Sequence, residues 1–282
     1  MSNTNVVRTA MAGILQTCQY TGKKLEVFPN STLNQKLSIH ADVQLIDTDM
    51  PHVRYVGIGD GGHDFLRGGN GKTKWVGVHH TPRHTAMYNQ LPFVLRPIGE
   101  DLTPEQRVRY RLRKVERHHG VDYIAYYLRV LDMSLSRPAL ELRVVEDGVT
   151  TSTPFVPSLE DLNPVPPVLV TDNAVTTTGD YVASTMKVPF IMTPEDVTEF
   201  INACRIRENE DGYGIISELV TVSGVDKTVN GAFNSVNQSY TEAIYAQVTA
   251  FVATAWVMDS LRDGTRLNLD IGNVEPLLTV SN

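Results

Sequence analysis

The longest regular alternation of hydrophobic and polar side chains runs through residues 106–133. Val108, Tyr110 and Leu112 alternate there with arginines, and successive side chains of a strand point to opposite faces. A polar turn at 117–120 and a second apolar run from 121 to 133 complete a predicted β-hairpin. Like charges on one strand repel, so we expect the arginine face to meet solvent or an acidic partner. Its arginines are Arg107, Arg109, Arg111 and Arg113.

Shorter alternating or apolar runs predict further strands, and one segment has the signals of a helix. Thr193 precedes Pro194 and two acidic residues, which is the pattern of an N-cap followed by the first turn of a helix, here expected to reach about residue 207. The segment 4–18 has no clear period. The fold class is therefore α+β and predominantly β, with antiparallel sheets, long hairpin arms and one or a few short helices. Strands are expected at 38–47, 54–58, 139–145, 149–155, 181–192, 214–225, 243–258, 267–271 and 277–280.

Two segments of unusual composition suggest how the chain is organised. Residues 57–77 are so rich in glycine that we expect a loop, and an ordered loop of this length is typically functional or held by a partner. Residues 154–167 contain five prolines, which should keep this segment extended and semi-rigid. We therefore predict a β-rich domain at 1–153, a connector at 154–167 and an α+β domain at 168–282.

Composition limits the class of protein. With 282 residues, 41% of them hydrophobic, the chain can bury a substantial core, and no apolar run approaches the roughly 20 residues that span a bilayer. The N-terminal residues lack the apolar core of a signal peptide. Cys18 and Cys204 form no pairing or metal-binding pattern, and we expect two buried free thiols.

Charge is distributed unevenly along the chain. Residues 1–139 carry 18 Lys and Arg against 12 Asp and Glu, whereas residues 140–282 carry 7 against 20, so the two halves have net charges of +6 and −13. Such a division suits subunits that meet head to tail, although both sets of charges can equally face water. Nucleic acid is an unlikely partner, because the basic excess is small and phosphate would repel the acidic half.

Two phosphate-binding motifs are matched only in part. Residues 57–62 read GIGDGG and fit GxGxxG, but Gly68, Gly69 and Gly71 interrupt the place where a helix must follow to meet a pyrophosphate. Gly71, Lys72 and Thr73 resemble the end of a P-loop, but Leu66 occupies the position of its first glycine. We predict no nucleotide site and no other cofactor.

The histidines offer the strongest candidate chemistry. All eight lie between residues 40 and 119, and His79, His80 and His84 follow His63 closely enough to suggest zinc or iron ligands. Pro82 prevents the helix that would place His80 and His84 on one face, and histidine is also common at interfaces. We assign no catalytic or metal-binding residue, and we predict partner binding by His79, His80, His84 and the four arginines of the hairpin.

Several segments of the sequence resemble structural proteins of tailed-phage virions, especially tail and baseplate components of large contractile-tailed phages. The segments are RYVGIGDGGH at 54–63, HHTPRHTAMY at 79–88, the arginine hairpin, STPFVP at 152–157 and the ending at 267–280. This resemblance implies a non-enzymatic, multi-copy subunit of the virion, assembled in the host cytoplasm. A baseplate wedge role comes ahead of neck, collar or tail-tube roles.

The expected partners are other tail and baseplate proteins and further copies of this chain, with no membrane and no small-molecule substrate. One alternative from a different class remains. In it, His63, His79, His80 and His84 form the metal site of a hydrolase.

Overall fold

The computed structural model describes residues 6–68, 71–166, 174–208, 213–233, 236–259 and 264–281, and its fold is mostly antiparallel β with short helices, as predicted. The chain forms two compact units, the first from residues 1–131 and 192–265, the second from 132–191 and 266–282. This division differs from the predicted boundary at 154–167. The difference arises because the last strand of the chain pairs within the second unit, so each unit is built from separated segments.

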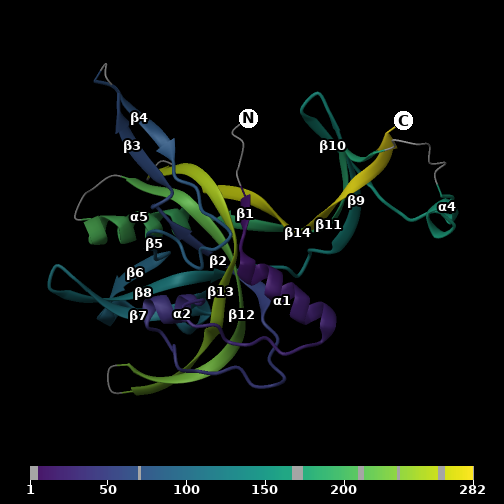
Figure 1. The fold of residues 1–282 in the computed structure, drawn as a ribbon. Helices are drawn as coiled ribbons and strands as arrows, with labels where there is room; N and C mark the ends of the chain where they lie inside the picture. Colours follow the sequence, from purple (N-terminus) through teal and green to yellow (C-terminus); the bar gives the residue numbers. More distant parts are fainter. Residues whose placement is uncertain are drawn as a thin grey trace. The chain divides into compact units, whose positions relative to one another are not determined.

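An eight-stranded sheet forms the centre of the first unit (Figure 1). Its strand order is β1-β13-β12-β2-β8-β6, with β5 paired to β2 and β7 paired to β8. Three register shifts interrupt the pairing of β12 with β13, and such irregularities bend long strands. The strands are β1 (Val6–Arg8), β2 (His52–Gly59), β5 (Gln90–Leu91), β6 (Val94–Pro97), β7 (Tyr110–His118), β8 (Val121–Val130), β12 (Tyr213–Phe233) and β13 (Val236–Asp259).

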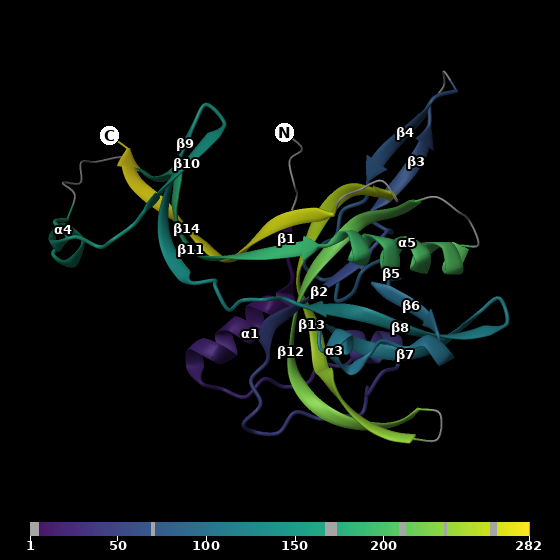
Figure 2. The same ribbon diagram turned by 180° about the vertical axis from the view of Figure 1, so that it is seen from behind.

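A threonine caps the start of each α-helix of this unit. The predicted helix is confirmed as α5 (Pro194–Glu208), which packs against β6 and β12 (Figure 2). The other helices are α1 (Ala10–Thr21), α2 (Leu33–Leu37), α3 (Pro104–Arg107) and the 3-10 turn η1 (Ile98–Glu100).

Two sequence-based expectations fail in the N-terminal part of this unit. Helix α1 was not apparent from periodicity; it starts after Thr9, whose hydroxyl accepts from the amide of Ala12, and ends at Gly22 with φ +63°. The strand expected at 38–47 is wrong. The chain there forms turns, starting with Ser38 and His40 at positive φ, and Ile39 and Leu45 are buried without strand pairing.

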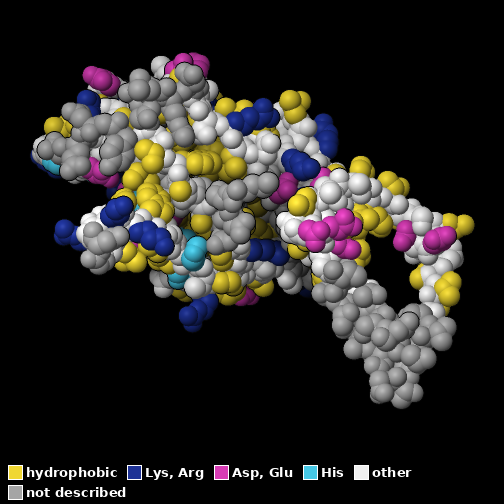
Figure 3. Space-filling view, turned by 90° about the horizontal axis from the view of Figure 1, so that it is seen from above, with side chains coloured by type: hydrophobic (Ala, Val, Ile, Leu, Met, Phe, Trp, Pro, Cys, Tyr) yellow, Lys and Arg dark blue, Asp and Glu magenta, His cyan; other side chains and the backbone are white. Residues whose placement is uncertain are grey.

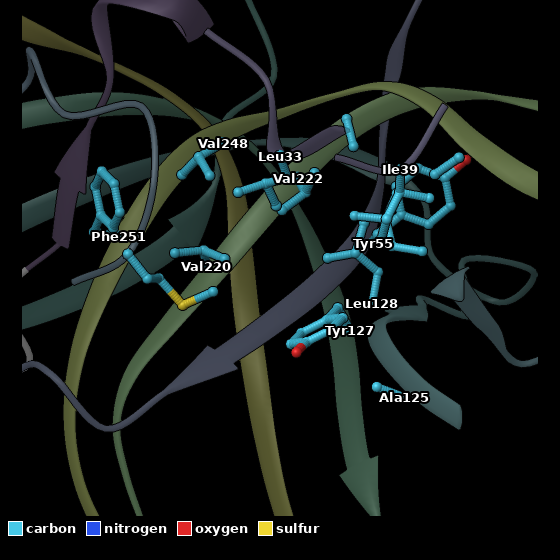
Figure 4. Packing of buried hydrophobic residues seen from close by; sticks show 14 of the residues in the cluster. Leu33, Ile39, Tyr55, Ala125, Tyr127, Leu128, Val220, Val222, Val248 and Phe251 are labelled. Atoms are coloured by element: carbon cyan, nitrogen blue, oxygen red, sulfur yellow. The ribbon is translucent and has the colours of Figure 1, made fainter. Parts of the chain in front are cut away.

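The core of the first unit lies between the sheet and its covering segments. Figure 4 shows Leu33, Tyr55, Leu128, Val220 and Phe251 among the side chains of this cluster. They come from α2 and four different strands, and the first four are fully buried. A smaller cluster packs α1 against β13. Burial of this apolar surface fixes the frame on which the polar clusters described below are placed.

The glycine-rich segment 57–77 is only partly a loop. Residues 57–59 complete β2, and β3 (His63–Arg67) pairs with β4 (Thr73–Gly77) in a separate two-stranded hairpin (Figure 1). The glycines lie mainly at the turn before this hairpin and at its tip, whereas its arms carry aromatic and charged residues. The prediction of a single long loop is therefore wrong.

The second unit is a four-stranded sheet of order β10-β9-β11-β14. The predicted strands are confirmed, and the two strands expected at the end of the chain are one. Within the proline-rich segment, α4 (Leu159–Leu162) replaces part of the expected extended chain, and residues 167–173 lie outside the described residues. The strands are β9 (Pro138–Glu146), β10 (Val149–Pro154), β11 (Ala174–Met192) and β14 (Thr265–Ser281).

Candidate functional site

The predicted cationic strand is part of β7, but its arginines meet acids of the same chain. Arg109 binds Asp196 at 2.9 Å, Arg111 binds Asp226 at 2.8 Å, and Arg113 binds Asp101 at 3.1 Å. Arg107, which like Arg109 precedes the first residue of β7, lies 3.4 Å from the same carboxylate of Asp101. The expectation that this face is free for solvent or an external acidic partner is therefore wrong for these contacts.

The tertiary fold explains why the arginines are paired within the chain. Sheet pairing and helix packing bring acids from the start of α5 and from β12 beside β7, although they lie about a hundred residues away in sequence. The side chains of Arg111 and Arg113 are each 8% exposed, whereas that of Arg109 is 44% exposed. Burial alone would raise the pKa of Asp226, but hydrogen bonds from Arg111 and Tyr55 outweigh it and lower that pKa. The role of these arginines in binding a partner stays a prediction, with Arg109, just before β7, more accessible than Arg111 and Arg113 within it.

A buried carboxylate interrupts the regular alternation of β7. Leu112 has φ +54°, a left-handed conformation that is costly for a residue with a side chain. Its amide donates to Oε2 of Glu242 at 2.6 Å, and the amide of Arg113 donates to Oε1 at 3.3 Å. Burial raises the pKa of Glu242 to about 7, against the effect of these amides and of the neighbouring guanidinium groups. Glu242 was missed because sequence alone does not show that this end of β13 is buried.

A second buried carboxylate, Glu218 of β12, organises the histidine region. Its Oε1 lies 2.6 Å from Nε2 of His80 and accepts from the amide of Tyr88 at 2.9 Å. Its Oε2 accepts from the amides of Gly61 at 2.9 Å and Asn89 at 3.3 Å. One carboxylate thus ties two separate loops to β12. A single glutamate within the apolar run 215–222 was the available signal, since a buried charge needs such partners.

The glycines at the end of β2 and just after it allow this close approach. A Cβ on Gly62 would lie 2.6 Å from the carbonyl oxygen of Ser217, and one on Gly59 would lie 2.4 Å from that of Asn89. The glycine motif therefore serves backbone packing around Glu218, and no helix follows it, which agrees with the rejection of a dinucleotide fingerprint.

His80 is enclosed. Its ring stacks between Phe251, at 3.7 Å between ring centroids, and Tyr88, at 4.2 Å, and its side chain is 5% exposed. Its Nδ1 lies 2.9 Å from Nδ1 of His84. The space beside it measures about 10 Å³, close to the size that holds one water molecule. A substrate cannot reach this histidine in the arrangement observed.

The other predicted histidines lie elsewhere. The ring of His63 stacks on Trp75 at 4.1 Å and its Nδ1 lies 2.9 Å from Oγ of Ser217, while His79 is exposed. Across the described ranges, no three His, Cys, Asp or Glu side chains are grouped so that they could hold a metal ion. The four predicted histidines therefore do not form one metal site in this arrangement, because His80 and His84 are in contact whereas His63 stacks on Trp75 and His79 is exposed.

Two compositional expectations can be compared directly. Both cysteines are buried and free, as predicted, and burial raises the pKa of the Cys204 thiol to about 12. None of the helices in the described part of the chain is long and apolar enough to cross a bilayer.

The chain was compared with known families, curated proteins and solved structures. A family model described as "Family of unknown function (DUF7208)" matches residues 1–282. The chain belongs to this family. No curated protein and no solved structure matches it. Within this DUF7208 member, the most developed polar clusters are the arginine and carboxylate pairs of β7 and the anchor around Glu218, and both hold the fold together.

Proposed function

We propose that this DUF7208 protein is a non-enzymatic structural subunit of a tailed-phage virion, present in several copies, most specifically a baseplate wedge component that acts through protein–protein contacts. The particular station rests on the resemblance of its sequence segments to tail and baseplate proteins. Other tail, neck or collar stations are the alternatives within the same proposal.

The observation that carries the proposal is the incomplete burial of the second unit. Sheets gain stability when a second layer covers at least one face, and this unit contains one four-stranded sheet and the single-turn helix α4. Its buried hydrophobic side chains, among the described residues, are Ala183, Val188, Phe190 and Leu269.

Many apolar side chains of this unit stay uncovered. Leu135 is 92% exposed, Leu159 and Leu162 of α4 are 74% and 76% exposed, and Val165 is 88% exposed. Strand β10 is exposed along its whole length. Figure 3 shows hydrophobic side chains at the surface among charged ones. Exposed apolar surface and an accessible strand edge are typical of a subunit that neighbours complete, which supports an assembly role.

The histidine region gives no support to a hydrolase. His80 is stacked between rings and Glu218 is saturated by backbone amides, so neither is placed to activate water for an incoming substrate.

Quantitative mass spectrometry of purified phage particles tests the proposal. We expect this chain to be enriched over the unpurified lysate at a fixed copy number relative to capsid and tail proteins. Absence from particles would refute it. A copy number that fits the symmetry of the tail would support a tail station, whereas a ratio that fits the capsid lattice would contradict one.

A pair of variants then tests the uncovered surface. Leu159→Asp with Leu162→Asp should leave the first unit folded and reduce incorporation into particles, because the change places charge where a neighbour's apolar surface is expected. Val43→Asp with Ile46→Asp makes the same chemical change in the first unit and serves as the control. Equal incorporation of the α4 variant and the wild-type chain would contradict a contact at this surface.

A further inference from the structure

The first unit contains an open hollow of about 490 Å³ that borders the Glu218 cluster at Tyr88 and Asn89. Segments far apart in the sequence line it: the end of α2, the loop before and into β5, the outer half of the β7–β8 hairpin, and the end of α5. Its cationic side chains are Lys36, Lys114, Arg117 and Arg207, with His118 beside them. In a chain of net charge −7, this is a local concentration of positive charge.

Two of these cations have backbone rather than acidic partners. Lys36 donates to the carbonyl of Met87, and Arg207 donates to the carbonyl of Gln90 at 2.9 Å. Within the described residues, no carboxylate lies within ion-pair distance of either cation. Burial lowers the pKa of Lys36, as expected for a cation partly removed from water. Both side chains are held in place by these carbonyls, and the carboxylates that act on them, Glu218 on Lys36 and Asp60 on Arg207, do so from beyond ion-pair distance.

Glu116 is the acid that lines the hollow, and its carboxylate is already engaged. It accepts from the hydroxyl of Tyr127 at 2.5 Å and lies 3.3 Å from His118 and 3.4 Å from Lys114. Burial would raise its pKa, but these contacts lower it. Glu116 therefore orders the β7 side of the hollow and pairs with Lys114, while Arg117 lies 3.8 Å from Asp122, so Lys36 and Arg207 are the two lining cations without an ion-pair partner among the described residues. Exposed apolar surface from Tyr88 and Val115 lies between the charges, each side chain being about half exposed.

The second unit has an acidic hairpin turn whose charge is opposite to that of the hollow. Strands β9 and β10 are joined by a tight turn in which Asp147 and Gly148 have φ +48° and +75°, the left-handed geometry of a two-residue hairpin turn. Glu146 and Asp147 are exposed there, and no hydrogen bond or ion pair to their carboxylates occurs within the described residues. Val145 and Val149, 37% and 62% exposed, flank them.

We propose that the hollow of one copy receives the Glu146–Asp147 turn of a second copy, so that like subunits join head to tail. This inference rests on the proposed function, in that it names one of the contacts through which the subunit assembles. The carboxylates meet Lys114 and Arg117 and also Lys36 and Arg207, which have no ion-pair partner among the described residues, while the flanking valines meet the apolar surface between these cations.

The mixture of chemistry favours a protein segment over a free phosphate compound. A small polyphosphate uses the cations but leaves Val115 and Tyr88 exposed, whereas a hairpin tip with paired carboxylates between valines covers both kinds of surface. The contact is heterologous, because the surface offered differs from the surface received, so it forms rings or extended arrays of subunits.

Sedimentation velocity over a concentration series tests the proposal with a charge swap. We expect the wild-type chain to self-associate, and this association to weaken as salt screens the pairs. Lys114→Glu with Arg117→Glu removes attraction and adds repulsion in the hollow, and Glu146→Lys with Asp147→Lys does so at the turn. Each double variant should weaken self-association by about tenfold or more. Lys23→Glu with Arg83→Glu makes the same change of charge at exposed positions outside the hollow and should leave association unchanged.

Mixing the two variants provides the decisive result. The reversed hollow and the reversed turn attract each other, so an equimolar mixture should recover hetero-association that neither variant shows alone. Recovery also demonstrates that both variants are folded. Circular dichroism checks the fold of each variant separately.

Three results would overturn the proposal: a wild-type chain that stays monomeric throughout the series, hollow variants that associate like wild type, or folded variants that fail to recover on mixing. Calorimetric titration with inorganic pyrophosphate adds a further arm. Saturable binding of pyrophosphate together with a monomeric wild-type chain would assign the hollow to a phosphate compound instead. Particle incorporation is measured separately, so the docking contact can fail while the virion role stands, and the reverse.

Discussion

Replacing Glu242 by glutamine should change how the stability of the first unit depends on pH. In the folded protein burial raises the pKa of this carboxyl from the ordinary 4.5 to about 7. A folded-state pKa above the unfolded value means that the group favours folding most when protonated, and that its contribution is lost as pH rises towards 7 and above. Glutamine carries no ionisable proton, so the variant lacks this loss.

The magnitude follows from the two pKa values. The difference between 4.5 and about 7 corresponds to about 3 kcal/mol of stability once the carboxyl is fully ionised in both states. Between pH 5 and pH 8.5, the free energy of unfolding of the variant minus that of wild type should therefore rise by about 2 to 3 kcal/mol. The amide oxygen of glutamine can still accept from Leu112, so the left-handed conformation there stays supported.

Urea unfolding followed by tryptophan fluorescence measures this difference. Trp75 and Trp256 both lie in the first unit, so the signal reports that unit alone. Glu26→Gln, at an exposed carboxyl, is the matched control and should give no such rise. A difference curve for Glu242→Gln that is flat across this range would refute the argument that burial outweighs the two amides and the guanidinium groups.

Further substitutions test the packing and the ion pairs by the same unfolding assay. Gly62→Ala should cost about 1 to 3 kcal/mol, because the new Cβ would lie 2.6 Å from a carbonyl oxygen of β12, whereas Gly13→Ala, with nothing within 4 Å in α1, should stabilise by about 0.5 to 1 kcal/mol. Equal effects of the two would contradict the close approach at Glu218. Arg111→Met should cost about 2 to 3 kcal/mol, which is less than leaving a buried charge with no partner, because Arg54 and Tyr55 still contact Asp226. Arg117→Met removes a solvent-exposed ion pair with Asp122 and should change stability by about 0.5 kcal/mol or less. Because Arg111 and Tyr55 hold the pKa of Asp226 below its ordinary value, the contribution of this carboxyl is present at neutral pH and is lost as pH falls, and Arg111→Met should reduce that acid sensitivity.

Local chemistry made several elements predictable. The helix that begins after Thr193 has its cap, its proline and its first-turn acids side by side in the sequence, and the hairpin around residues 119–120 has regular alternation on both arms. Helix α1 lacks acidic residues in its first turn and basic residues in its last, so only its cap and Gly22 marked it. The turns at 38–47 imitate a strand because their apolar residues happen to alternate, although no partner strand pairs with them.

The candidate sites were less predictable, because their members meet only through the sheet. The sequence shows four arginines at alternating positions, but it does not show that Asp196 and Asp226 lie against them. It shows a group of histidines, but it does not show that Phe251 and Tyr88 enclose one of them. Hydrophobic periodicity alone does not show which side chains pair with one another.

The sequence by itself determined the mostly β character, the hairpins, helix α5 and the buried free thiols, since each depends on side chains within a few residues of one another or on general hydrophobicity. Only the tertiary structure decided which charges form ion pairs, which glycines are packed against a backbone, and which cations line the hollow. Electrostatic and steric contacts depend on distance in space, and pairing β12 with β2 and β13 joins positions that lie far apart along the chain.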